Sequence, residues 1–229
     1  MAERDTPAGE IARHRFLWLL IALVILLLAY PHFRDTTTGA MMGGLTSLLL
    51  LVTGVHALQT NRFVFAGAIV LAVAAGSGTV ITTVAGIRGH QLVEASYSVF
   101  YAYTTICVFV EVVRTRVVTR DTILGIICVY LLIGVTFGTL YDFLETVHPG
   151  SFQVNVDAPD EPLGWRTLIF YSFMTLTTVG YGDVTPLSHE AQSLAILEGV
   201  IGVLYVAVLI ARIVGAYRRA EGEEARRSP

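Results

Sequence analysis

The sequence predicts an all-α membrane protein with six transmembrane helices and one additional re-entrant segment. Of its 229 residues, 54% are apolar and 14% are charged, whereas soluble domains carry roughly 25% charged residues. The apolar residues gather in long segments, most of which approach the ~20 residues that a helix needs to cross a bilayer. Arginine is concentrated in every second connection between these segments. The six predicted spans are Phe16–Tyr30, Gly39–Leu58, Phe63–Ile87, Ala95–Val110, Ile123–Tyr141 and Ala191–Ile210.

The first span follows Arg13 and Arg15, as the apolar part of a signal peptide would. The residues after it contain no small-x-small cleavage site, so we expect a helix that is retained. The first and fourth spans are short. Each lengthens if the polar residue at its end, His32 or Glu111, lies at the membrane interface.

A seventh apolar stretch, Leu163–Val179, lies between the fifth and sixth spans. It is too short to cross a bilayer comfortably, and it ends in a glycine-rich sequence. Irregular backbone at membrane depth is tolerated where it is buried in protein or lines a water-filled cavity. The stretch is therefore predicted to enter the membrane and to return to the same side.

The arginines predict the orientation of the chain. With a cytoplasmic N-terminus, 12 of the 15 arginines fall in cytoplasmic segments and three fall outside. This distribution follows the positive-inside rule. Six spans then return the C-terminus to the cytoplasm, and the re-entrant segment enters from the outside.

Composition and motifs exclude several classes of function. A chain this apolar is not expected to be a soluble enzyme, a disordered protein or a nucleic-acid-binding protein. The six histidines are scattered, and no nucleophile–base pair or metal-ligand cluster stands out, so neither an enzyme nor a cofactor is expected. Cys107 and Cys128 both lie in apolar segments, where inert thiols are the ordinary interpretation.

The most specific motif lies in the stretch Trp165–Asp183, with the sequence WRTLIFYSFMTLTTVGYGD. An apolar, aromatic helix candidate is followed by Thr177-Thr178-Val179-Gly180-Tyr181-Gly182-Asp183. This string resembles the potassium channel signature T-V-G-Y-G and matches it at every position. A dehydrated potassium ion can be held by backbone carbonyls that all face one axis. Such an arrangement requires alternating backbone handedness with positive φ angles, which glycine adopts at little steric cost.

The resemblance implies a six-transmembrane, one-pore-loop, non-voltage-sensing potassium channel of prokaryotic type. By this resemblance, the carbonyls of Thr178, Val179, Gly180 and Tyr181 bind potassium, and Gly182 completes the filter. Because one loop cannot surround an ion, four copies are needed, and a homotetramer is implied. The expected partners are other copies of the chain, membrane lipids and permeant potassium ions, with no nucleic acid. The expected location is the plasma (inner) membrane, with both termini cytoplasmic.

Several residues near this motif are candidates for supporting the filter or for gating. Thr177 and Asp183 flank it, and the aromatic residues Phe170, Tyr171 and Phe173 are expected to surround it together with Tyr181. Glu198 is an acid within an apolar helix, which marks it as functional. It either lines the cavity or braces the filter through pore-helix hydroxyls such as those of Thr175 or Tyr171. Gly202 lies where channels of this family place a gating hinge, although packing is the alternative there, and Gly199 is assigned to packing.

The first four spans depart from the voltage-gated pattern. The fourth span contains no arginine, and Arg114, Arg116 and Arg120 all follow it at the cytoplasmic edge. A voltage sensor needs several charges that move through the membrane field, so weak or no voltage dependence is expected. The predicted domains are a cytoplasmic N-terminal segment (1–15), a four-helix membrane domain without a voltage-sensor arginine array (16–120), a pore domain (121–215) and a cytoplasmic C-terminal tail (216–229).

Three other functions remain open at this point. A non-selective cation channel would need a degraded filter, whereas the motif is intact. A potassium transporter subunit of the type with four pore loops in one chain is disfavoured because the motif occurs once. A non-conducting scaffold or modulatory subunit that keeps the pore sequence is compatible with everything above.

Overall fold

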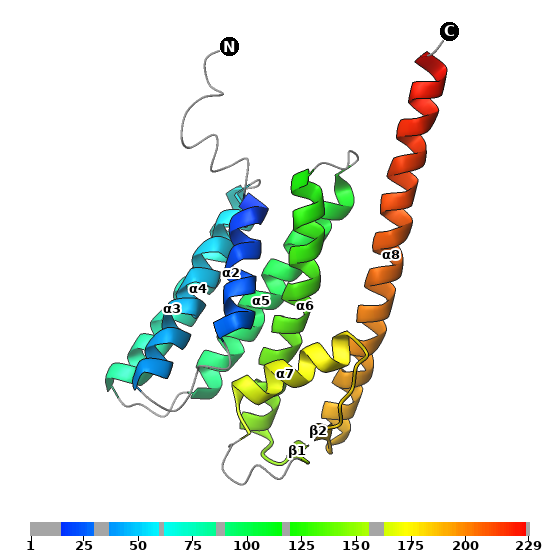
Figure 1. The fold of residues 1–229 in the computed structure, drawn as a ribbon. Helices are drawn as coiled ribbons and strands as arrows, with labels where there is room; N and C mark the ends of the chain where they lie inside the picture. Colours follow the sequence, from blue (N-terminus) through cyan, green and yellow to red (C-terminus); the bar gives the residue numbers. More distant parts are fainter. Residues whose placement is uncertain are drawn as a thin grey trace.

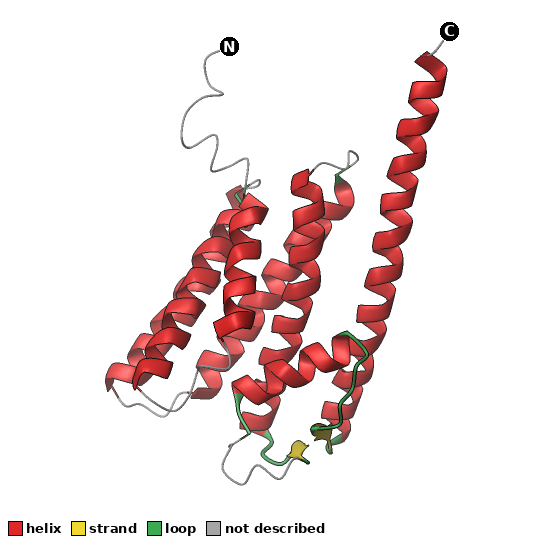
Figure 2. Ribbon diagram, viewed as in Figure 1, coloured by secondary structure: helices red, strands yellow, loops and turns green. Residues whose placement is uncertain are grey.

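The computed structural model describes residues 15–29, 37–59, 62–85, 90–115, 120–155 and 163–227. Within these ranges the chain is almost entirely helical (Figures 1 and 2). In chain order the elements are α2 (Arg15–Ala29), α3 (Thr37–Ala57), α4 (Arg62–Ala85), α5 (His90–Arg114), α6 (Arg120–Val147), β1 (Phe152–Val154), α7 (Trp165–Leu176), β2 (Val184–Pro186) and α8 (His189–Arg227).

Each predicted apolar stretch forms a helix, and three helices are longer than predicted. Among the described residues, α5, α6 and α8 contain helices long and apolar enough to cross a membrane, over Gln91–Arg114, Arg120–Val147 and His189–Arg212. The apolar helices over Arg15–Ala29, Gly44–Ala57 and Arg62–Gly78 are shorter, so the count of six spans stays a prediction. Helix α8 continues to Arg227, through the segment predicted as a tail. That segment is rich in alanine, arginine and glutamate, which favour helix.

Two short strands depart from the all-α prediction. β1 pairs with β2 in antiparallel orientation, with Phe152 opposite Pro186 and Val154 opposite Val184. Phe152 and Val184 are buried, so this small sheet is held by side-chain packing as well as by its backbone bonds. It joins the segment after α6 to the segment before α8 (Figure 2).

Helix α6 is the centre of the described fold. It contacts α2 and α5 on the side of the first four helices, and α7 and α8 on the other (Figure 1). Its buried side chains include Val129, Leu132 and Val135. At one end of the bundle, Arg15 of α2 forms an ion pair with Glu111 of α5. The same arginine lies 3.9 Å from the Asp121 carboxylate at the start of α6.

Helix α8 is attached to the rest of the chain mainly through one half of its length. It contacts α7, α6 and β2, and it then runs past the ends of the other helices (Figure 1). Many of its large apolar residues are exposed, including Val203, Leu204, Val208 and Ile210. Its apolar surface therefore lacks cover from its own chain.

Candidate functional site

Helix α7 ends directly at the glycine-rich motif, and its last carbonyls bind the first amides of that motif. The N–H groups of Val179 and Gly180 both donate to the Met174 carbonyl, at 2.9 and 3.1 Å. The Thr178 N–H donates to the Thr175 carbonyl at 3.0 Å. The carbonyl groups at a helix end have no intrahelical partners, so these bonds satisfy them and attach the motif to the helix.

The backbone of the motif alternates in handedness. Thr178, Gly180 and Gly182 have φ angles of 60°, 55° and 82°. The expected left-handed glycines are therefore present. The left-handed threonine was not predicted, because the sequence gives no signal for it. A residue with a side chain costs of order 1–3 kcal/mol in this region, so the surrounding bonds must hold Thr178 there.

The two motif glycines are required by backbone angle and not by lack of space. A Cβ atom built on Gly180 or Gly182 meets no other atom within 4 Å. An alanine at either position would be accommodated by the surroundings, but its backbone would be strained. Substitution there therefore tests the carbonyl arrangement with little effect on packing.

The motif is exposed within the single chain. Val179 is 49% exposed and Tyr181 is 68% exposed, although both side chains are largely apolar. The Tyr181 ring stacks on Phe170 of α7, with centroids 6.4 Å apart and an interplanar angle of 11°. The exposed face of this strand is thus available to line a path or to meet another chain.

Tyr171 and Phe173, the other two aromatic residues expected around the filter, pack on α6 and β1. Tyr171 packs on Tyr141 of α6 and on Phe152 of β1, with centroid distances of 5.2 and 5.6 Å. The ring of Phe173 lies against Gly134 of α6, so closely that a Cβ there would be 2.7 Å from it. That these two residues surround the filter stays a prediction. Both hold α7 against α6 and β1.

Glu198 lies buried between three helices, with none of its surface exposed. The Tyr141 hydroxyl of α6 donates to its Oε2 atom at 2.6 Å. The Ser172 hydroxyl of α7 contacts its Oε1 atom at 2.5 Å and the Gly134 carbonyl at 2.7 Å. This is the geometry of a brace and not that of a cavity-lining acid. Its partners are Ser172 and Tyr141, whereas Thr175 and Tyr171 were expected.

Gly202 packs against the end of α7. A Cβ on Gly202 would lie 2.5 Å from the Leu176 carbonyl oxygen, so only glycine allows this approach. Helix α8 continues unbroken through this position, and a hinge at Gly202 stays a prediction. Gly199 was assigned to packing, but a Cβ there meets no other atom of the described chain within 4 Å.

The C-terminal end of the motif is bound by Asn155, a residue that the sequence analysis did not predict. The side-chain amide of Asn155 donates to the Gly182 carbonyl at 2.9 Å and to the Thr185 hydroxyl at 3.2 Å. Its backbone N–H donates to the Asp183 carbonyl at 2.7 Å. Asn155 directly follows β1, and an asparagine in a polar loop gives no sequence signal for such a role.

Beyond Gly202, helix α8 makes two hydrogen bonds to α5 and α6 through the side chains of Tyr205 and Arg212. The Tyr205 hydroxyl donates to the Ile126 carbonyl at 2.6 Å. The Arg212 guanidinium donates to the Thr115 carbonyl at the end of α5. The Tyr205 ring also packs on Phe109 and Tyr130, with centroid distances of 6.4 and 5.9 Å. These contacts connect α8 to α5 and α6.

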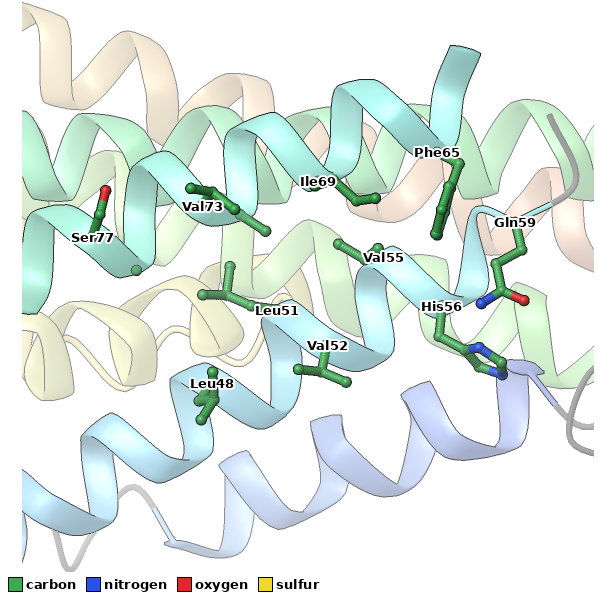
Figure 3. Close-up of a pocket in the computed structure, with 12 residues that line it drawn as sticks. Leu48, Leu51, Val52, Val55, His56, Gln59, Phe65, Ile69, Val73 and Ser77 are labelled. Atoms are coloured by element: carbon green, nitrogen blue, oxygen red, sulfur yellow. The ribbon is translucent and has the colours of Figure 1, made fainter. Parts of the chain in front are cut away.

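A groove with a cavity volume of about 640 Å³ lies between α3 and α4, away from the motif. Figure 3 shows the side chains of Leu51 and Val55 from α3 facing those of Ile69 and Val73 from α4. The lining is mostly apolar, and its polar members are His56, Gln59 and Ser77. The groove therefore offers few groups that could bind or transform a polar ligand.

Comparisons with known proteins agree with the geometry of this site. The ion channel family model matches residues 125–219, which run from α6 through α7 and the motif into α8. Over 94 residues the chain is 32% identical to the inward rectifier potassium channel Kirbac3.1 of Paramagnetospirillum magnetotacticum. The alignment covers 39% of this chain and 28% of that protein, so the chain spans less than a third of its relative. The region that holds the motif is therefore similar to ion channels, a potassium channel among them.

Proposed function

We propose that this protein is a potassium-selective channel that conducts potassium passively through a filter formed by Thr178–Gly182. In this filter the carbonyls of Thr178, Val179, Gly180 and Tyr181 bind the ion. The observation that carries the proposal is the alternation of left-handed residues at 178, 180 and 182, directly after the end of a short helix. In an ordinary strand successive carbonyls point to opposite sides. Alternating handedness turns them to one side, where they can replace the water around an ion.

A homotetramer follows from this proposal and is supported by exposure. One filter strand supplies one set of carbonyls, and a potassium filter of this type uses four. Val179 and Tyr181 are exposed in the single chain, and only 11% of the most apolar part of α8 is buried. Fourfold assembly would cover both surfaces, with membrane lipids around the outside.

The remaining parts of the proposal concern the membrane domain. We propose six spans in the plasma (inner) membrane, with both termini in the cytoplasm and domains at 1–15, 16–120, 121–215 and 216–229. Within α5, arginine occurs only at the end, at Arg114. The four-helix domain therefore has few charges that could move through the field, and we propose weak or no voltage dependence.

The proposal is tested by potassium flux from proteoliposomes that contain the purified protein under a potassium gradient. We expect flux that barium blocks and that sodium cannot replace. Gly180→Ala should abolish this flux and leave the oligomer intact, because the alanine strains the backbone of the carbonyl ring. Gly44→Ala is the control, since a Cβ on Gly44 also meets no other atom within 4 Å, but Gly44 lies in α3 and has no positive φ angle.

Other outcomes would identify a different function. Equal flux of sodium and potassium would indicate a non-selective cation channel, and saturable flux far below channel rates would indicate a transporter subunit. A homotetramer without flux would indicate a scaffold or modulatory subunit. Normal flux in Gly180→Ala would refute the carbonyl path.

A further inference from the structure

The outer end of the filter is connected to the loop after α6 by a continuous set of hydrogen bonds. The Glu145 carboxylate accepts the N–H groups of Gly150 and Phe152, at 2.8 and 3.1 Å. This orders the turn that leads into β1. The Ser151 carbonyl then accepts the Leu187 N–H at 2.7 Å, and β1 pairs with β2. The position of Asn155 is therefore set by the paired strands that precede it.

Asn155 binds two successive carbonyls at the exit of the filter. Its side chain holds the Gly182 carbonyl and its backbone N–H holds the Asp183 carbonyl. These two bonds fix the orientation of consecutive peptide groups immediately after Tyr181. The Gly182 carbonyl therefore accepts a hydrogen bond from outside the α7–filter segment, and so does the Asp183 carbonyl.

We propose that Asn155 is a positioning residue, which holds the Gly182 carbonyl away from the ion path and thereby ends the row of ion sites at Tyr181. This inference rests on the proposed function of the filter. Its physical basis is that carbonyl oxygens crowded around an axis repel one another when no potassium ion lies between them. In that state the conducting shape of the outer filter depends on the protein's own hydrogen bonds, and Asn155 supplies two of them.

Three variants of the full chain test this role. Asn155→Asp replaces the amide donor by an acceptor that faces the Gly182 carbonyl. Asn155→Ala removes the side-chain donor but keeps the backbone bond to Asp183. Gln153→Asp is the matched control, because it makes the same change of charge at an exposed position of β1, the strand that Asn155 directly follows.

The variants are reconstituted in proteoliposomes and held in potassium-free sodium buffer for increasing times before potassium flux is measured. We expect Asn155→Asp to lose flux about tenfold faster than the wild type, the change expected from the loss of one hydrogen bond. Asn155→Ala should be intermediate, and Gln153→Asp should behave as the wild type. Equal rates in Asn155→Asp and Gln153→Asp would overturn the proposal. If Asn155→Asp fails to assemble, a wild-type rate in Asn155→Ala would overturn it.

Hydrogen exchange gives a second readout that does not depend on conduction. Amide exchange in residues 182–188 should rise in Asn155→Asp and stay unchanged in Gln153→Asp. Absence of flux in the wild type would refute the proposed function. Unchanged exchange in Asn155→Asp would refute the positioning role even where the wild type conducts.

Discussion

Helices α6 and α8 have nearly the same hydropathy but very different surroundings. In the most apolar part of α6, 67% of the residues are buried by the chain itself, whereas in α8 the share is 11%. Helix α6 lies between the first four helices and α7, while α8 touches its own chain along one side only. Hydropathy thus marks both as candidate membrane helices, but it does not predict which of them the rest of the chain buries.

The difference indicates that the two helices are stabilised in different ways. Helix α6 gains its stability from packing within one chain, and its glycines admit side chains of α7 at close range. Helix α8 carries a buried carboxylate, Glu198, in its first half and exposed apolar residues further along. We interpret α6 as the helix on which the rest of the single chain packs. We interpret α8 as the helix whose exposed apolar surface the proposed tetramer would bury.

The largest expected effect comes from filling the α6–α7 contact. A Cβ on Gly138 would lie 3.0 Å from the Cα atom of Ile169 in α7, which cannot move independently of its helix. Gly138→Leu should destabilise the protein by about 3 kcal/mol, as measured by thermal unfolding in detergent. Gly199→Leu on α8 is the comparison, since nothing lies within 4 Å of its Cβ. We expect Gly199→Leu to leave the free energy of unfolding of the single chain nearly unchanged. Equal losses of stability in both variants would contradict the difference in packing between the two helices.

A smaller effect on stability is expected at Glu198, the buried carboxylate of α8. Glu198→Ala leaves the Tyr141 and Ser172 hydroxyls without their acceptor, at a cost of about 2 kcal/mol in stability. Glu198→Gln should lose less, because an amide can accept from Tyr141 and donate to Ser172, leaving the serine hydrogen for the Gly134 carbonyl. Glu190→Gln is the control, at an exposed position of the same helix. A lower unfolding temperature for Glu198→Gln than for Glu198→Ala would contradict the role of Glu198 in bracing α6 and α7.

The smallest effect concerns the inner tie of α8 to α6. Tyr205→Phe removes the bond to the Ile126 carbonyl but keeps the ring contacts with Phe109 and Tyr130. Loss of a single hydrogen bond should lower the free energy of unfolding by about 1 kcal/mol. A loss as large as that of Gly138→Leu would show that α8 depends on its own chain as strongly as α6 does.

Much of the architecture could be predicted from residue type and spacing alone. Apolar segments of membrane length predicted the positions of the helices, because the bilayer sets a minimum length. The short apolar stretch before the motif predicted a separate helix between the last two long ones. The alternation of glycine with larger residues predicted positive φ angles at Gly180 and Gly182, since few other residues adopt them. Each of these features depends on residues that lie close together in the sequence, so the sequence alone predicts it.

The partners of the individual side chains were decided by the tertiary structure. Glu198 meets Tyr141 across 57 positions of the chain and Ser172 across 26, and Asn155 meets Gly182 across 27. Such pairs depend on the rotation of each helix about its own axis and on the pairing of two three-residue strands. A helix that is apolar on every side does not encode that rotation in its sequence. For this protein the sequence determined where the apolar helices lie and where the strand with positive φ angles lies, and packing between segments decided what holds that strand in place.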